Sequence, residues 1–254
     1  VPDEPASVAN VYPNTPNGLY GVAIMIEINF ASAVPDELKA ELEKATWLEA
    51  SRPVGIGSWT WPTDSIMAYR PQTFWPAHTD IHMHFDWTAY GLADQDPQVK
   101  FRVGRSQILR VKYSTQMGKL FRDGHFLRKV PVSLGMPGHA TTSGIKAIME
   151  RYEVKEMVNR EAHYDVMVPY AMRLTPSGEF LHAAPWNPDL GVAPESHGCT
   201  NISLEDGKWF YEHSLEGDPV IEHGTGVPVD WWEGPGALWN TPWKDWAKGA
   251  HALP

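Results

Sequence analysis

Short apolar segments separated by turn residues run along most of this chain, and they limit it to a mainly β fold. Residues 21–30 read GVAIMIEINF, and strand-like segments follow at 56–61, 66–70 and 80–88. Pro62-Thr63-Asp64 is a turn sequence between two of them. Because short strands at this spacing pair into two packed sheets, we expect a β-sandwich in the N-terminal part.

A second β-rich region follows a polar segment at 90–98 that contains Gly and Pro. Asp123-Gly124 is a strong hairpin turn, and Ser203 is suited to cap a helix that runs to about residue 214. A shorter helix is expected at 35–44. Strands are predicted at 106–114, 119–121, 126–134, 145–154, 164–174 and 178–183. We therefore expect one domain at 1–97 and a second, with one main helix, at 98–225; residues 1–16 are expected to be an extended lead-in.

The C-terminal residues 226–254 carry five of the twelve tryptophans. Aromatic clusters can stack on sugars, but a large ring more often packs, burying roughly 150–250 Å². We expect this tail to pack on the second domain. Thr241-Pro242 is predicted to start a short helix there.

Composition narrows the partners and the compartment. A formal charge of −10 argues against nucleic acid and anionic membrane surfaces as partners. No stretch approaches the roughly 20 apolar residues of a membrane span. One cysteine excludes an intramolecular disulfide, which fits a reducing compartment and equally an exported enzyme whose only thiol is its nucleophile. The chain begins at Val1 rather than Met, so removal of a signal or anchor is expected.

The only cysteine, Cys199, stands in the sequence SHGCTN at 196–201, with His182 upstream. A thiolate is the nucleophilic form of cysteine, and nearby imidazoles and helix N-termini favour it. A free cysteine is more often a small buried hydrophobe. Beside His197 and Gly198, and just before a helix, we interpret Cys199 as a catalytic nucleophile.

These residues resemble a known family. The sequence FLHAAPWN at 180–187, followed by SHGCTN, is similar to the signature of L,D-transpeptidases with a YkuD-type catalytic domain. The segment GSWTWPTDSIMAYRPQTFWPAHT resembles the Ig-like domain that precedes it in the mycobacterial type. The chain departs from that type in three ways: a loop of 13 residues at 183–195, Ala183 where relatives carry Ser, and an abbreviated lid segment at 153–163.

The resemblance implies a role for each residue of the motif. Cys199 is the nucleophile, His182 the base or ion-pair partner, and the backbone carbonyl of Ala183 holds the imidazole. The N–H groups of Gly198 and Cys199 are expected to form the oxyanion site, beside a loop placed by His197. Substrate contacts are expected from Tyr164, Trp186, Ser196 and Asn201, although Tyr164 could equally be a plain strand aromatic. A Gly/Thr loop at 134–144 is expected to border the donor site.

The function implied is peptidoglycan cross-linking by L,D-transpeptidation. Cys199 would attack the carbonyl between residues three and four of a tetrapeptide stem and release D-Ala. A side-chain amine of a second stem would then take the acyl group, which gives a 3→3 cross-link without a cofactor. Carbapenems are the expected covalent inhibitors, and the periplasm or cell wall is the expected location.

Three alternatives remain. An L,D-carboxypeptidase would use the same acyl-enzyme with water. A non-catalytic wall-binding protein would rely on the Ig-like domain, but the intact His182 and Cys199 argue against it. A papain-like protease normally has its Cys before its His, the opposite order.

One further histidine pair invites a metal interpretation. His82 and His84 lie at i and i+2 of a predicted strand, so they share a face. No Cys and no clear carboxylate at ligand spacing accompany them in the sequence. We therefore expect a solvated sandwich face and no metal site.

Overall fold

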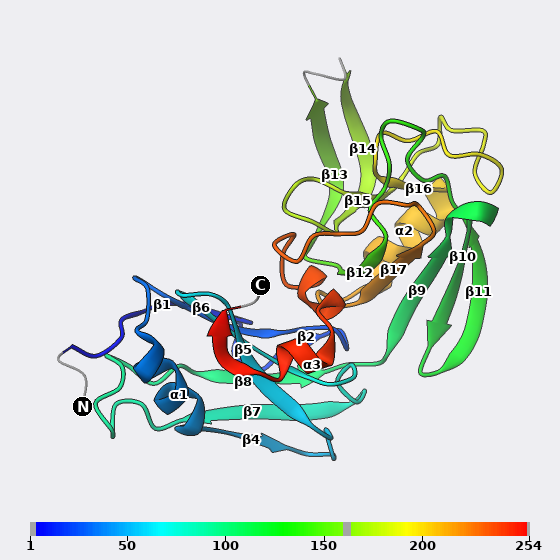
Figure 1. Cartoon of the computed structure of the whole chain (residues 1–254). Coiled ribbons are helices and arrows are strands. Elements are labelled where there is room, and N and C mark those ends of the chain that lie inside the picture. Colours follow the sequence, from blue (N-terminus) through cyan, green and yellow to red (C-terminus); the bar gives the residue numbers. More distant parts are fainter. Residues whose placement is uncertain (1–3, 160–163, 253–254) are drawn as a thin grey trace. The chain divides into compact units, whose positions relative to one another are not determined.

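The computed structural model describes residues 4–159 and 164–252, and the chain divides into two compact units (Figure 1). The N-terminal unit comprises Val1–Arg105 and Thr241–Pro254, and the C-terminal unit comprises Ser106–Asn240. Both are built mainly from strands, as expected. No helix in the described part of the chain is long and apolar enough to cross a membrane.

The N-terminal unit contains two sheets. One has the strand order β1-β3-β6-β5-β18, with bounds Val8–Tyr12, Ile26–Phe30, Ile66–Pro71, Gly57–Thr63 and Gly249–Ala252. The other has the order β2-β8-β7-β4, with bounds Gly18–Tyr20, Val99–Val103, Thr79–Phe85 and Thr46–Ala50. Helix α1, Asp36–Lys44, follows Pro35 and confirms the helix predicted at 35–44.

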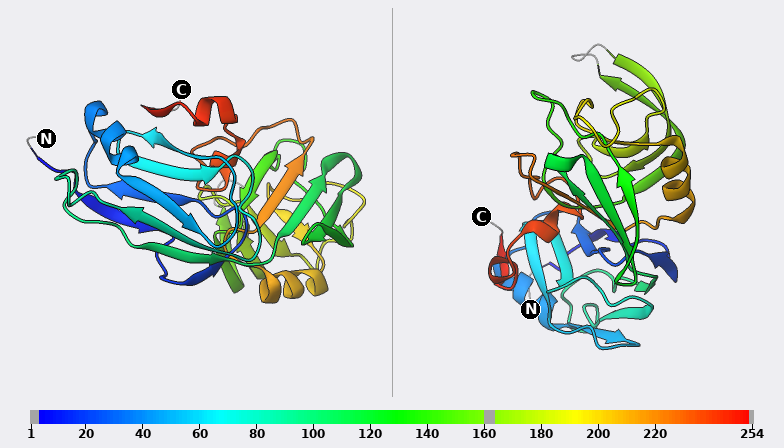
Figure 2. Two further views of the ribbon diagram at one scale, coloured as in Figure 1. Left: turned by 90° about the horizontal axis from the view of Figure 1, so that it is seen from below. Right: turned by 90° about the vertical axis from the view of Figure 1, so that its right-hand side faces the viewer.

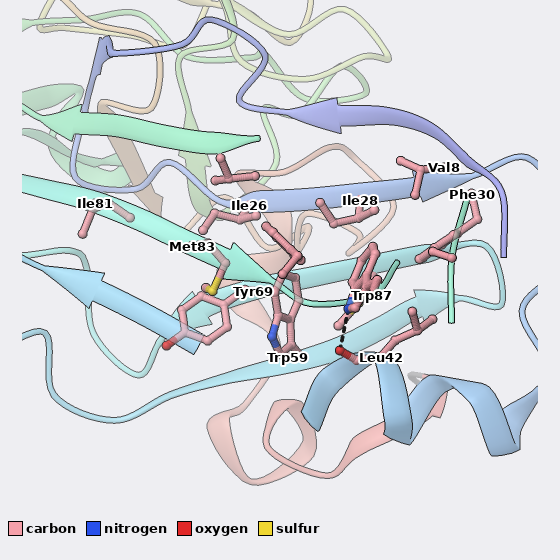
Figure 3. Packing of buried hydrophobic residues seen from close by; sticks show 14 of the residues in the cluster. Val8, Ile26, Ile28, Phe30, Leu42, Trp59, Tyr69, Ile81, Met83 and Trp87 are labelled. Carbon is pink, nitrogen blue, oxygen red and sulfur yellow. Dashed lines mark hydrogen bonds between the residues drawn. The ribbon is translucent and has the colours of Figure 1, made fainter. Parts of the chain in front are cut away.

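The core of this unit is aromatic and aliphatic, and Figure 3 shows it from close by. Alternation along β7 buries Ile81, Met83 and Phe85 and leaves the residues between them on the outer face. Trp87 is fully buried, and its indole N–H donates to the carbonyl of Leu42 at 2.8 Å, a bond visible in Figure 3. A buried indole satisfied in this way stabilises the core without leaving an orphan donor.

Two expectations about the N-terminal unit are wrong. Strand β8 pairs with β2 and β7, so the unit ends at Arg105 and not at residue 97. The polar segment 90–98 is a loop of this unit, because Leu92 and Ala93 are buried and the Asp94 carboxylate accepts from the backbone N–H of Val8. Residues 1–16 are no mere lead-in, since β1 pairs with β3.

The C-terminal unit also contains two sheets. One has the order β11-β10-β9-β17-β12, with bounds His125–Pro131, Met117–Arg122, Gln107–Lys112, Pro219–His223 and Gly144–Ala147. The other has the order β13-β14-β15-β16, with bounds Glu150–Asn159, Tyr164–Arg173, Phe180–Ala183 and Thr200–Ile202. A short 3₁₀ turn, η1 (Tyr113–Thr115), connects β9 to β10.

Helix α2, Leu204–His213, is the main helix of the C-terminal unit and contacts β13, β14 and β15 (Figure 2). Its N-cap is Ser203, as predicted. The Ser203 hydroxyl accepts a hydrogen bond from the backbone N–H of Asp206 at 3.0 Å. A Cβ at Gly207 would lie 2.6 Å from the Cβ of Ala183. This glycine therefore lets the helix approach β15 closely and fixes the strand that carries His182.

The predicted strand at 145–154 is instead two strands in different sheets, β12 and β13. β13 pairs antiparallel with β14 over ten residues each, which forms a long hairpin. The segment 153–163, which the sequence indicates to be abbreviated, supplies part of this hairpin. Residues 160–163 of that segment lie outside the described residues.

The tail does not pack as expected. Strand β18 runs parallel to β5, and the indole N–H of Trp246 donates to the carbonyl of Ser58 at 2.9 Å. The Arg70 guanidinium lies over the rings of Trp243 and Trp246, at 5.3 and 4.4 Å from their centroids. Residues 241–252, including the short helix α3 (Trp243–Trp246), therefore complete the N-terminal unit.

Only the first half of the tail packs as predicted on the C-terminal unit. The 3₁₀ turn η2, Ala237–Asn240, lies against β12. The Asn240 side chain accepts the N–H of Ile145 and donates to its carbonyl. The prediction that 226–254 as a whole covers the second domain is wrong. Trp243 and Trp246 pack against the Arg70 guanidinium, and β18 pairs with the edge of β5.

Candidate active site

The turn at 196–199 holds its shape by internal hydrogen bonds. The Ser196 hydroxyl donates to the carbonyl of Cys199 and accepts the N–H of Gly198 at 3.2 Å. Gly198 has φ +118°, a conformation that side chains rarely adopt. Ser196 and the Gly198 N–H are thus used within the turn, so the substrate and oxyanion roles predicted for them find no support in these bonds.

The Gly/Thr loop at 134–144 supports this turn through backbone hydrogen bonds. The Met136 N–H donates to the Ser196 carbonyl at 2.9 Å, and the Gly135 N–H donates to the Thr141 hydroxyl at 2.8 Å. A Cβ at Gly135 would lie 2.0 Å from the His139 carbonyl oxygen, so no other residue fits there without a backbone shift. The loop expected to border the donor site therefore positions the nucleophile turn.

Strand register places the nucleophile and the base on one face. β15 and β16 are parallel, with Leu181 opposite Thr200 and His182 opposite Asn201. Because successive side chains alternate, Cys199, Asn201 and His182 all face away from the Leu181 side. Cys199 and His182 line the same cavity, of about 420 Å³. The structure thus brings together two residues that lie 17 positions apart.

The His182 imidazole is held by the carbonyl predicted from the sequence. Nδ1 donates to the Ala183 oxygen at 2.9 Å, which leaves Nε2 as the unprotonated nitrogen of a neutral ring. Burial lowers the pKa of His182 to about 4, and the Ala183 carbonyl only partly opposes that shift. His182 is therefore neutral at physiological pH, and its Nε2 is free to accept a proton.

The Cys199 thiol is buried and also neutral. Burial raises its pKa to about 12, and the negative charge of Glu179 adds to the rise. Its Sγ lies 3.8 Å from the Gly178 carbonyl oxygen, a second environment that favours the protonated thiol. The motif suggested a thiolate stabilised by a helix N-terminus. Helix α2 begins only at Leu204, and the cost of desolvating a charged sulfur outweighs any stabilisation from that helix. The resting site holds a thiol and an imidazole, not an ion pair.

The walls of the cavity come from the hairpin and from the loop 183–195. Trp186 is half exposed and its ring centroid lies 6.3 Å from that of His182, consistent with the predicted wall of a substrate groove. Apolar residues of the hairpin, which the sequence reasoning did not single out, line the opposite part: Met157, Val166 and Val168. The alternation of Val166 and Val168 along β14 was the available signal. Polar and acidic residues complete the lining: Asn187, Asp189 and Glu195.

Asn201 presents an unsatisfied group to this cavity. Its side chain is 5% exposed, and its Oδ1 has no hydrogen-bond partner among the described residues. A buried polar atom without a partner is costly, roughly 1–3 kcal/mol. A substrate N–H would remove that cost, which supports the predicted role in substrate binding.

Two other predicted residues occupy less direct positions. His197 lines the cavity, and its ring centroid lies 4.8 Å from that of His139. Tyr164 is the first residue of β14, four positions before Val168, which packs with Cys199. The side chain of Tyr164 lies outside the described residues, so its contact with substrate stays a prediction.

A buried ionic network is hydrogen-bonded to Thr200, the residue that follows Cys199. Lys146 of β12 is completely buried and is paired with Glu179 and with Glu222 of β17. Glu222 also accepts from the Thr200 hydroxyl, next to Cys199, and Glu179 accepts from the N–H and hydroxyl of Thr142. The sequence reasoning missed this network because its members are scattered over 77 positions of the chain.

This network contains one lysine and two glutamates, so its positive and negative groups are unequal in number. Burial would lower the pKa of Lys146, but Glu222 and Glu179 outweigh it and raise the pKa, so the ammonium persists. Burial raises the pKa of Glu179; Lys146 opposes this rise and the charge of Glu222 adds to it. The network ties together the strands that carry both reacting residues.

One premise about the N-terminal unit is also wrong. Glu49 of β4 stands directly opposite His82 of β7, so a carboxylate does join the His82 and His84 pair. The sequence could not show it because Glu49 lies 33 positions earlier, on a strand that was not predicted.

Comparison with protein families accounts for both units. Residues 106–221 match the L,D-transpeptidase catalytic domain named YkuD, and residues 3–91 match a bacterial Ig domain. L,D-transpeptidase 5 of Mycobacterium tuberculosis is 29% identical over 250 residues, which cover 92% of this chain and 54% of the relative. L,D-transpeptidase 1 of the same organism is 28% identical over 223 residues, which cover 84% and 83%. L,D-transpeptidase 2 of Mycobacterium tuberculosis is 28% identical over 246 residues, which cover 90% of this chain and 59% of the relative. The chain thus spans 54% of the length of L,D-transpeptidase 5 and 59% of that of L,D-transpeptidase 2.

Solved structures agree with this assignment. An L,D-transpeptidase from Mycobacterium smegmatis is 29% identical with a TM-score of 0.70 and covers 87% of this chain and 100% of its own. The structure of LdtMt1 in complex with imipenem is 26% identical with a TM-score of 0.73 and covers 86% and 99%. A cysteine site on a domain that matches the YkuD model indicates the class of protein. The chain contains a domain that matches the L,D-transpeptidase catalytic domain, preceded by one that matches a bacterial Ig domain, and it is similar to mycobacterial L,D-transpeptidases over most of its length.

Proposed function

We propose that this chain forms 3→3 cross-links between peptidoglycan stem peptides through a thioester on Cys199. The observation that carries the proposal is the shared face of His182 and Cys199 in one cavity, with the imidazole fixed by the Ala183 carbonyl. This arrangement supplies a nucleophile, a base and a support for the base, which acyl transfer requires.

The protonation states define the first half of the reaction. His182 Nε2 takes the thiol proton as Sγ attacks the carbonyl between residues three and four of a tetrapeptide donor. The imidazolium then returns the proton to the departing amine, so D-Ala leaves and a thioester remains. Proton transfer at the moment of attack is needed because a free thiolate is costly in this buried setting. With Gly198 engaged in the turn, the Cys199 N–H is the proposed donor to the oxyanion.

The second half reverses these roles. The side-chain amine of a second stem enters as an ammonium, loses one proton to solvent and attacks the thioester as the free amine. His182 accepts the second proton from that nitrogen and passes it to the departing sulfur, so the amide forms and the Cys199 thiol is restored. Asp189 and Glu195 place negative charge on the cavity lining, which suits an approaching cationic amine. No cofactor enters either half. Because stem peptides belong to the cell wall, we propose that the chain works after export.

An L,D-carboxypeptidase is the second candidate, because water could resolve the same thioester. Trp186 lines the cavity and is half exposed, which leaves a path from solvent for either acceptor. The ratio of cross-linked dimer to tripeptide, measured with and without an amine acceptor, separates the two. A wall-binding protein without catalysis would give neither product.

The acyl-enzyme can be tested by intact mass after mixing with a carbapenem. We expect the mass to rise by one drug equivalent, since structures of relatives are described with imipenem and with a faropenem-derived adduct. Cys199→Ala should show no adduct, and His125→Ala, which changes an exposed residue of β11, should behave as the parent. An adduct that persists in Cys199→Ala would overturn the assignment of the nucleophile.

A further inference from the structure

A second cluster of reactive side chains lies on the N-terminal unit. Glu49, His82 and His84 project from the outer face of the β4–β7 pair, opposite to the face that packs in the core. Glu49 is directly across from His82, and His84 is the next residue on that face. Neither the proposed transpeptidation nor the packing of the sandwich uses these three residues.

Their ligand atoms already converge. Glu49 Oε2 lies 3.0 Å from His84 Nε2 and 3.9 Å from His82 Nδ1, and the three ligand atoms all lie within 4.8 Å of one another. Ligands of a tetrahedral zinc ion, each at about 2.0–2.1 Å from the metal, are about 3.3 Å apart. Small side-chain rotations therefore suffice to place one ion among all three.

The surroundings restrict the imidazoles. The Trp47 indole stacks on His84, with ring centroids 4.9 Å apart and planes 4° from parallel. The ring centroids of His82 and His84 are 3.7 Å apart. Both histidines are about two-thirds to three-quarters covered, although they lie on the outer face of a sheet. Side chains held this way lose little entropy when they bind an ion.

The neighbouring charges have opposing effects. Lys100 of β8 stands opposite His82 and would repel a cation, whereas Arg102 is engaged by Asp80 at 3.4 Å. Lys100 therefore weakens the cluster as a cation site without occupying it.

We propose that Glu49, His82 and His84 form a binding site for one divalent transition-metal ion, Zn²⁺ in the first instance. Two imidazoles and one carboxylate are the donors that such ions favour, and three protein ligands leave a fourth position for water or an external ligand. The site is independent of the proposed transpeptidation, since all three residues belong to the N-terminal unit.

Calorimetric titration of the tag-free, chelator-treated full chain with Zn²⁺ tests the proposal. The titration uses Cys199→Ala as the parent, so that the thiol cannot bind the ion. We expect one equivalent bound, and a Kd raised at least 10-fold by His82→Ala or His84→Ala. The matched control His125→Ala changes an exposed strand histidine of the other unit and should leave the Kd unchanged.

Two further variants sharpen the result. Lys100→Gln removes the opposing charge and should lower the Kd several-fold, and Glu49→Gln should raise it. Melting curves without metal establish that each variant is folded. The proposal is overturned if folded His82→Ala and His84→Ala bind Zn²⁺ as the parent does, or if the parent binds none. Broadening of the His82 and His84 ring signals by Ni²⁺ in NMR spectra gives an independent readout.

Discussion

Burial of Cys199 sets the chemical character of the site. A thiol with a pKa near 12 beside an imidazole with a pKa near 4 stays protonated over the whole physiological range. Such a nucleophile is protected from indiscriminate oxidation and alkylation, because those reactions need the thiolate. Reactivity must then come from proton transfer to His182 once a substrate is in place.

This protonation scheme predicts the pH dependence of alkylation. The rate at which iodoacetamide modifies Cys199 should keep rising through pH 10, because the thiolate fraction grows until the pKa of about 12 is reached. An ordinary thiol would level off near pH 9. The measurement is intact mass against time in buffers of pH 6 to 10.5. A plateau at neutral pH would show a thiolate stabilised by an imidazolium and would contradict the neutral pair.

Loss of His182 should be more damaging than loss of any other histidine in the cavity. We expect His182→Ala to slow acylation by a carbapenem by at least about 10²-fold, the usual scale for a positioned base. His197→Ala is the matched control and should cost much less, since His197 is in contact with His139 at the edge of the cavity. Stopped-flow acylation rates compare the two. Near-parent rates for His182→Ala would move the base elsewhere.

At the level of single residues, the sequence was informative about local chemistry and poor about environment. The motif identified Cys199 and His182, and the Ala183 carbonyl contact is confirmed. The sequence left His182 open as a base or an ion-pair partner; burial favours the base, and burial is a property of the folded chain. Ser196 and Gly198 were given chemical roles, whereas their polar groups satisfy each other inside the turn. No local pattern distinguishes these two uses.

Among the structural elements, the parallel pairing of β15 and β16 does most to build the site. It aligns His182 with Asn201, and α2 holds β15 from the side through the close contact at Gly207. The buried network of Lys146, Glu179 and Glu222 ties β12 and β17 to these strands. Breaking such a network leaves an uncompensated buried charge, which is strongly destabilising.

Replacement of Lys146 tests the structural importance of that network. We expect Lys146→Met to lower the free energy of unfolding by about 3–5 kcal/mol, since two carboxylates would be buried without a cation. Urea denaturation measures the loss. The triple variant that also carries Glu179→Gln and Glu222→Gln should recover part of it. Equal stability of Lys146→Met and the parent would mean that the carboxylates simply take up protons at little cost.

Element prediction succeeded where periodicity or a cap was strong. Helices α1 and α2 and the main strands follow from apolar spacing, Pro35 and Ser203. Within the described residues, seven strands were missed, and none of them is longer than five residues: β1, β2, β4, β8, β16, β17 and β18. Each except β16 gains its stability from pairing with a strand that is not its neighbour in sequence. The omission of β4 explains why Glu49 was not associated with the two histidines.

At the scale of the whole molecule, the two ends of the chain belong to the same unit. Thr241–Pro254 rejoins Val1–Arg105, so the catalytic unit is an insertion between two parts of the N-terminal unit in sequence. The tail tryptophans were correctly expected to pack, but the sequence could not name their partner. Arg70 decides it, because its guanidinium stacks on two of the rings and donates to the Thr241 carbonyl at 2.7 Å.

Trp246 should therefore stabilise the N-terminal unit alone. It is fully buried, and Trp246→Ala should cost about 3–5 kcal/mol, as expected for truncation of a large core aromatic. Exposed Trp232 gives the matched control, for which Trp232→Ala should have little effect. Calorimetry follows the unfolding transitions, and carbapenem acylation reports on the catalytic unit. A large loss of acylation in Trp246→Ala would link the tail to the active site after all.

Division of the chain at its structural boundaries gives the last prediction. A chain of residues 106–240 contains both sheets of the C-terminal unit, α2 and every residue proposed for the chemistry. We expect it to fold and to be acylated at close to the parent rate. A chain of residues 106–254 should aggregate, because Trp243 and Trp246 would lose Arg70 and the β5 edge that cover them. Size-exclusion chromatography and intact mass test both chains. If 106–254 were well behaved and 106–240 insoluble, the tail would belong to the catalytic unit, as the sequence alone suggested.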